Sequence, residues 1–130
     1  MNKELTRKKI LMVDDEPDMV EIIIEMLTDK GYQAFGAANG VDGIIINDKE
    51  NPDLIILDLR MSGMDGIETL RRIRKTDDKV KVIILTGFGN PDVAKDMVDL
   101  DISECLSKPI ENDQLLHVIR YVLARQTEKN

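Results

Sequence analysis

The sequence predicts an α/β fold in which a single parallel β-sheet carries helices on both faces. Short apolar runs of the kind found in strands alternate five times with stretches of helical periodicity, and the connections between them are short. Three of the runs are strongly apolar and two are weak, as expected for three inner strands and two edge strands. The expected strands cover residues 10–13, 33–37, 54–57, 80–85 and 102–106.

The segments between these strands carry helix start and stop signals. Pro17 suits the first turn of a helix, because its missing N–H would be unpaired there, and Gly31 suits the end of the same helix. Asn39 is expected to cap the second helix and Asn112 the last one. The residues expected to form the core-facing stripes are Val20, Ile23, Ile24 and Leu27; Val41, Ile44, Ile45 and Ile46; Ile67, Leu70 and Ile73; Val93, Ala94, Met97 and Val98 (in a helix over 91–100); and Leu115, Leu116, Ile119, Val122 and Leu123.

Length and composition indicate one globular domain. With 130 residues, 42% of them hydrophobic, the chain can bury a core, and we expect a domain over 9–125 between an extension (1–8) and a tail (126–130). No apolar stretch approaches the roughly 20 residues that span a bilayer, so membrane insertion is not expected. The charged start is unlike a signal peptide. Cys105 is the only cysteine, which excludes an internal disulfide and favours the cytoplasm.

The net charge of −7, from 25 acidic and 18 basic residues, disfavours direct binding of nucleic acid. Hard cations and basic surfaces of proteins are better partners for such a chain. One histidine and one cysteine also make a structural zinc site a poor explanation of the sequence.

Polar side chains follow four of the five expected strands. Asp14 and Asp15 follow the first strand, Asp58 the third, Thr86 the fourth and Lys108 the fifth. The carboxyl ends of parallel strands lie at one edge of a sheet, where open α/β sheets bind ligands. Two carboxylates about 5 Å apart repel by roughly 3 kcal/mol at an effective dielectric constant near 20. One lysine cannot cancel the repulsion among three, whereas a divalent cation can.

Oxygen-only ligands point to Mg²⁺, which often shares its coordination with a phosphate. In phosphoryl transfer, Mg²⁺ on Asp14 and Asp15 would take one phosphoryl oxygen, Lys108 a second, and the Thr86 hydroxyl or a nearby N–H a third. Asp58 would be the nucleophile that becomes an acyl phosphate. The chain has no Gly-rich phosphate loop, which excludes a P-loop NTPase.

These residues stand in a set of motifs: Val13-Asp14-Asp15-Glu16, Leu57-Asp58-Leu59-Arg60-Met61, Met64-Asp65-Gly66, Leu85-Thr86-Gly87 and Ser107-Lys108-Pro109. The set resembles the receiver domain of two-component response regulators, the CheY-like family, over residues 9–125. The resemblance implies a flavodoxin-like (βα)5 three-layer sandwich with strand order 2-1-3-4-5. It implies that a histidine kinase or phosphotransfer protein phosphorylates Asp58. It further implies that Asp15, Asp58 and the Arg60 backbone carbonyl bind Mg²⁺ directly, that Asp14 acts through water, and that the Lys108–Pro109 peptide is cis.

The same resemblance implies a signalling domain, not an enzyme, which catalyses only its own phosphorylation and dephosphorylation. Its output would be a changed surface around the fourth helix, fifth strand and last helix, read by a downstream protein, an output domain or a phosphorylation-dependent homodimer.

The sequence departs from the family pattern at several positions. Cys105 stands where an aromatic switch residue is frequent, and we expect it to be a buried packing residue. Ser62 replaces a frequent proline and is expected to loosen the loop after Asp58. In the family, the positions of Arg60 and Phe88 flank the phosphoryl group, and we expect these bulky side chains to slow attack by water.

Other interpretations of the same residues remain. The acids from Asp14 to Glu16 could simply cap a helix, although a cap needs only one of them. A phosphatase of the haloacid dehalogenase type also uses an aspartyl nucleophile, but Arg60 stands where its second acid would be, and no cap insertion is present. A pseudo-receiver that no longer takes phosphate would not need all five polar groups. His117 is expected to be an exposed polar residue of the last helix.

Overall fold

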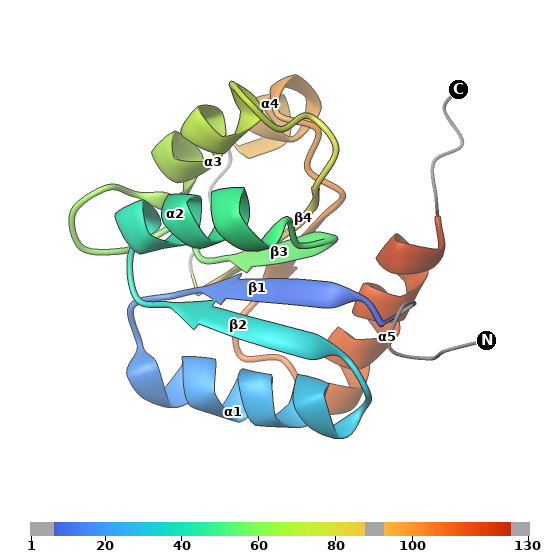
Figure 1. Ribbon diagram of the computed structural model, residues 1–130. Coiled ribbons are helices and arrows are strands. Elements are labelled where there is room, and N and C mark those ends of the chain that lie inside the picture. Colours follow the sequence, from blue (N-terminus) through green and yellow to red (C-terminus); the bar gives the residue numbers. More distant parts are fainter. Residues whose placement is uncertain (1–6, 88–92, 126–130) are drawn as a thin grey trace.

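A computed structural model describes residues 7–87 and 93–125, which form a five-stranded parallel sheet in the order β2-β1-β3-β4-β5. Helices α1 and α5 cover one face of the sheet and α2, α3 and α4 the other, which gives three layers (Figure 1). The predicted fold class and strand order are confirmed. In chain order the elements are β1 (Lys9–Val13), α1 (Pro17–Asp29), β2 (Gln33–Ala37), α2 (Gly40–Glu50), β3 (Leu54–Leu57), α3 (Gly66–Arg74), β4 (Lys81–Thr86), α4 (Val93–Asp99), β5 (Glu104–Ser107) and α5 (Asn112–Ala124).

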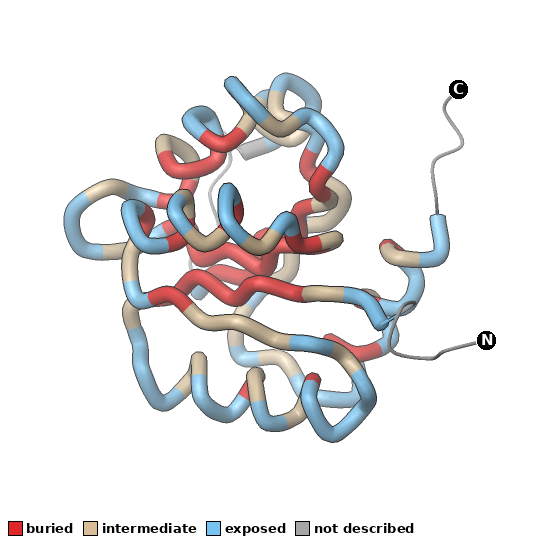
Figure 2. Tube along the Cα trace, in the orientation of Figure 1, coloured by how far each residue is buried: buried red, intermediate tan, exposed pale blue. Residues whose placement is uncertain are grey.

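The strands divide the hydrophobic core into two halves. Leu11 and Val13 of β1 contribute to the half beneath α2 and α3, whereas Ile10 and Met12 contribute to the half beneath α1 and α5. Side chains alternate between the faces of a strand, so a strand covered on both faces must be apolar at every position. This is the reason for the unbroken apolar run of β3, all of which is buried at the centre of the sheet (Figure 2).

Local signals place most helix ends where they were predicted. Pro17 is the first residue of α1, and Gly31, with φ of +96°, follows its last turn. Asn39 caps α2 by accepting the backbone N–H of Asp42 at 2.8 Å. The prediction that Asn112 caps the last helix was wrong. Asn112 already lies inside α5, and Glu111 occupies the cap position, where its carbonyl accepts the N–H of Leu115 at 3.0 Å.

Helix α2 packs on the sheet with only part of the predicted stripe, since Ile44 and Ile46 contact the core as expected. Val41 and Ile45 are 53% and 57% exposed, whereas Gly43 and Asn47 are buried. A Cβ atom on Gly43 would lie only 3.0 Å from a methyl carbon of Val13, so a larger residue here would require the Val13 side chain to shift. The buried face of α2 therefore combines Gly43 with Ile44, while Val41 and Ile45 turn to solvent.

The edge of the sheet formed by β5 also differs from the prediction. Cys105 is exposed and not a buried packing residue, because β5 is an edge strand in which Leu106 is the residue that packs on the core. Val98, expected in the core-facing stripe of the fourth helix, is 80% exposed. The expected start of that helix at Pro91 lies outside the described residues.

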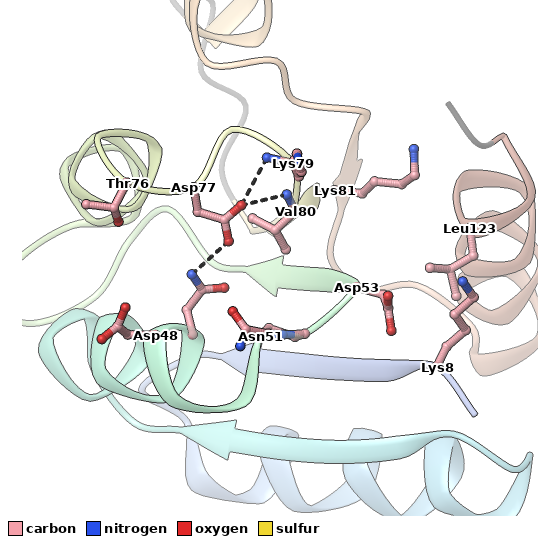
Figure 3. Close-up of a pocket in the computed structure, with 12 residues that line it drawn as sticks. Lys8, Asp48, Asn51, Asp53, Thr76, Asp77, Lys79, Val80, Lys81 and Leu123 are labelled. Atoms are coloured by element: carbon pink, nitrogen blue, oxygen red, sulfur yellow. Dashed lines mark hydrogen bonds between the residues drawn. The ribbon is translucent and has the colours of Figure 1, made fainter. Parts of the chain in front are cut away.

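Asp77 organises the turn that leads into β4. One of its carboxylate oxygens accepts the backbone N–H groups of Lys79 (3.0 Å) and Val80 (3.1 Å), and the other accepts Asn47 Nδ2 at 3.2 Å. The four residues so joined line a cavity of about 410 Å³ at the amino ends of the strands (Figure 3). Burial acts to raise the pKa of Asp77, but the hydrogen bonds and the charge of Arg74 outweigh it and lower the pKa.

Replacement Asp77→Ala should lower the free energy of unfolding at pH 7 by about 1–3 kcal/mol, because two backbone donors and one amide lose their acceptor. Since the folded-state pKa is lowered, the ionic part of this stabilisation is present above about pH 4 and is lost as the pH falls through the folded value. Urea unfolding at pH 7 and at pH 3 would measure both effects. The exposed Asp48→Ala serves as control, and an equal loss at both pH values would contradict this account.

Candidate functional site

Three carboxylates meet at the carboxyl edge of the two central strands. The backbone ladder runs one residue beyond each strand, since Asp14 N donates to Ala37 O (3.1 Å) and Asp58 N to Val13 O (3.0 Å). Strands β1 and β3 are paired neighbours, so these two acids and the adjoining Asp15 come together. One ligand oxygen from each of the three carboxylates lies within 4.8 Å of the others. Asp14 is fully buried and Asp58 nearly so.

Lys108 follows the edge strand β5, and its side chain extends to this cluster. Its ammonium donates to Asp14 Oδ2 at 2.7 Å and to Asp58 Oδ2 at 3.3 Å, and it lies 3.5 Å from Glu16 Oε1. Its backbone N–H donates to the carbonyl of Thr86 at 2.8 Å, which extends the pairing of β5 with β4. The peptide between Lys108 and the next residue, Pro109, is cis, as expected.

Burial and neighbouring charges shift the pKa values of both Asp14 and Lys108. Burial raises the pKa of Asp14, and the hydrogen bonds from Lys108 and the Glu16 backbone only partly offset this effect. For Lys108, burial alone would lower the pKa, but the hydrogen bond to Asp14 and the charges of Asp14 and Asp58 outweigh it and raise the pKa. One ammonium therefore faces three clustered carboxylates, and the excess of oxygen ligands suits a hard divalent cation.

Thr86 is the last residue of β4 and is 3% exposed. Within residues 7–87 and 93–125, its Oγ1 has no hydrogen-bond partner. A buried hydroxyl left unpaired costs about 1–3 kcal/mol, so such groups are rare in folded proteins. The unpaired hydroxyl stands at the same sheet edge as Asp58 and is suited to a bound acceptor.

The loop between β3 and α3 contributes contacts that the sequence did not predict. The backbone N–H of Arg60, an exposed residue, donates to Asp58 Oδ1 at 3.2 Å. Ser62 donates to Asp15 Oδ2 both from its backbone N–H (2.9 Å) and from its hydroxyl (3.3 Å). The contact of Glu16 with the cluster was likewise not predicted, because contacts between loops leave no periodic signal.

The remaining predicted residues lie apart from the cluster or outside the described part of the chain. His117 is exposed on α5, as expected. Phe88, expected to flank the phosphoryl group, lies outside the described residues. Among the residues that the structure describes, none of the helices is long and apolar enough to cross a membrane.

Comparison with known proteins supports one family. The sequence model of the response regulator receiver domain matches residues 10–120. Sporulation initiation phosphotransferase F of Bacillus subtilis is 36% identical over 119 residues, which cover 92% of this chain and 96% of that protein. The transcriptional regulatory protein GlrR of Escherichia coli is 34% identical over 110 residues, or 85% of this chain, but these make up only 25% of that regulator.

Solved structures agree with the sequence comparison. A CheY-like receiver domain protein of Methanospirillum hungatei has a TM-score of 0.87 at 25% identity, covering 91% of this chain and 94% of that one. CheY of Borrelia burgdorferi, in a complex with CheX, BeF3 and Mg²⁺, has a TM-score of 0.84 at 26% identity, covering 94% of each chain. The match to the family model and the clustered acids at the sheet edge lead to one conclusion: the chain belongs to the receiver domain family of two-component response regulators.

Proposed function

We propose that Asp58 accepts a phosphoryl group from a histidine kinase or a phosphotransfer protein. The observation that carries this proposal is the ammonium of Lys108, which lies within hydrogen-bond distance of both Asp14 and Asp58. Such a cation beside an acid at a strand end suits a group that gains negative charge. The kinship with a protein named a phosphotransferase points the same way.

Mg²⁺ is the metal that fits this donor set of carboxylates. We expect Asp15, Asp58 and the backbone carbonyl of Arg60 to hold the ion directly and Asp14 to act through water. Bound there, Mg²⁺ would offset the negative charge of the carboxylates and of the phosphoryl oxygens. The complex of a related CheY with BeF3 and Mg²⁺ supports this assignment.

In the proposed transfer, Asp58 is the nucleophile, and Lys108 and Thr86 bind the phosphoryl oxygens. A carboxylate oxygen of Asp58 forms the new O–P bond while the bond from phosphorus to the donor's histidine nitrogen breaks, and that nitrogen keeps the electron pair. Lys108 pairs with one phosphoryl oxygen, and the hydroxyl of Thr86 donates to another. The protein is modified once per event and does not turn over an external substrate, so we class it as a signalling domain and not as an enzyme.

The signal would leave through the surface formed by α4, β5 and α5. This surface exposes Val98, Cys105 and Tyr121, which are apolar or weakly polar side chains suited to a protein partner. A separate protein, an output domain or a phosphorylation-dependent homodimer could occupy it. The chain spans 96% of the Bacillus relative but only 25–53% of the matched transcriptional regulators. Receivers that make up nearly a whole protein and receivers that are part of a longer one therefore both occur among its relatives.

We place the protein in the cytoplasm, which fractionation of cells would test.

Incubation with Mg²⁺ and a small acyl phosphate should add one phosphoryl group to the protein, and Asp58→Asn should abolish the addition, because an amide oxygen cannot replace the carboxylate nucleophile. Mass spectrometry of the intact protein would measure this. Asp48→Asn removes the same charge from an exposed position of α2 and should leave the reaction unchanged. Steady hydrolysis of phosphate monoesters would favour the phosphatase of the haloacid dehalogenase type instead.

Replacement Thr86→Val should leave the unmodified protein as stable or about 1 kcal/mol more stable, because it removes a buried hydroxyl without a described partner. The same variant should lose part of the thermal stabilisation that Mg²⁺ with beryllofluoride gives the wild type. Thr69→Val is the matched control, since this buried hydroxyl donates to Asp65 O at 2.8 Å and its loss should destabilise the protein. Equal destabilisation by both substitutions would contradict the role given to Thr86.

A further inference from the structure

Ser62 makes a contact that joins two loops of the site. It lies between β3 and α3, and both of its donors, the backbone N–H and the hydroxyl, bond to a single oxygen, Oδ2, of Asp15. Asp15 follows β1, 47 positions earlier in the chain. Proline at this position would supply neither donor, because it has no backbone N–H and no hydroxyl.

Asp14 and Asp58 share one donor, whereas the hydrogen bonds described for Asp15 come from elsewhere. Asp14 accepts the backbone N–H of Glu16 and the ammonium of Lys108, and Asp58 accepts the N–H of Arg60 and the same ammonium. Lys108 makes no such hydrogen bond to Asp15 among the described contacts; the hydrogen bonds described for Asp15 come instead from the β3–α3 loop.

The geometry leaves Asp15 able to bind a cation while Ser62 holds it. A carboxylate offers about four acceptor sites on its two oxygens, and the two bonds from Ser62 occupy sites on Oδ2 alone. With these bonds in place, Asp15 already lies in the cluster whose ligand oxygens are within 4.8 Å of one another. The bonds restrict the rotation of a partly exposed side chain, which would otherwise have to be ordered when the ion binds.

We propose that Ser62 is a positioning residue that fixes the Asp15 carboxylate for a divalent cation and thereby couples occupation of the site to the conformation of the β3–α3 loop. The backbone N–H supplies the shorter bond and the hydroxyl the longer one, so the N–H carries the larger share. This inference rests on the proposed role of Asp15 as a metal ligand. It replaces the expectation that serine at this position loosens the loop.

Calorimetric titration of the full chain with MgCl2 at constant ionic strength tests the proposal. Ser62→Ala removes only the hydroxyl and should raise the dissociation constant for Mg²⁺ a few-fold. Ser62→Pro removes both donors and should raise it about tenfold, the lower end of the range for outer partners of metal ligands. Ser62→Thr keeps both donors and should bind as the wild type does. Ser103→Ala, a serine substitution in the turn before β5, is the control for a substitution away from the cluster.

Circular dichroism confirms that each variant is folded, and the amide proton shift of residue 62 gives a reading independent of any activity. In the wild type this proton should resonate downfield, as carboxylate-bonded amides do, and stay downfield in Ser62→Ala. Equal or tighter Mg²⁺ binding by Ser62→Ala and by folded Ser62→Pro would overturn the role of Ser62 alone. Absence of Mg²⁺ binding to the wild type would overturn the proposed metal site and this inference with it.

Discussion

The site depends on one ion-pair arrangement, in which the ammonium of Lys108 lies between two buried carboxylates. Asp14 has no exposed surface and Asp58 very little, so bulk water solvates both charges poorly. A buried charge is tolerated when it is paired and hydrogen-bonded, and the 2.7 Å bond to Asp14 meets that condition. The second bond, of 3.3 Å to Asp58, is longer, and Asp58 is the carboxylate to which the proposed function gives the phosphoryl group.

The topology of the sheet makes this arrangement accessible to residues far apart in sequence. The strand order places β1 beside β3 at the centre, which brings Asp14 and Asp58 to one edge, and places β5 two strands from β3. Lys108 spans that distance because its backbone continues the pairing with Thr86 before its long side chain turns toward the acids. The apolar core thus fixes the positions of the strand ends, and these in turn fix the positions of the charged side chains.

The features of the fold and the site that could be predicted from the sequence are those with a periodic or positional signal. Asp14, Asp58 and Thr86 each end an apolar run, so the parallel topology alone predicts that they converge. The orientation of α2 was only partly predictable in this way: Ile44 packs on the core as expected, but Gly43 lies against Val13 and Val41 and Ile45 are exposed. Contacts between loops, such as Ser62 with Asp15, depend on backbone geometry that no local pattern encodes.

The central claim, that Lys108 stabilises the buried Asp14, is tested most directly by a double-mutant cycle in urea without added metal. Lys108→Met should destabilise the protein by about 3 kcal/mol, because it leaves Asp14 as an unpaired buried charge. Adding Asp14→Asn to Lys108→Met should restore at least 1 kcal/mol of that loss, a coupling typical of residues in direct contact. Additive effects of the two substitutions would contradict the account.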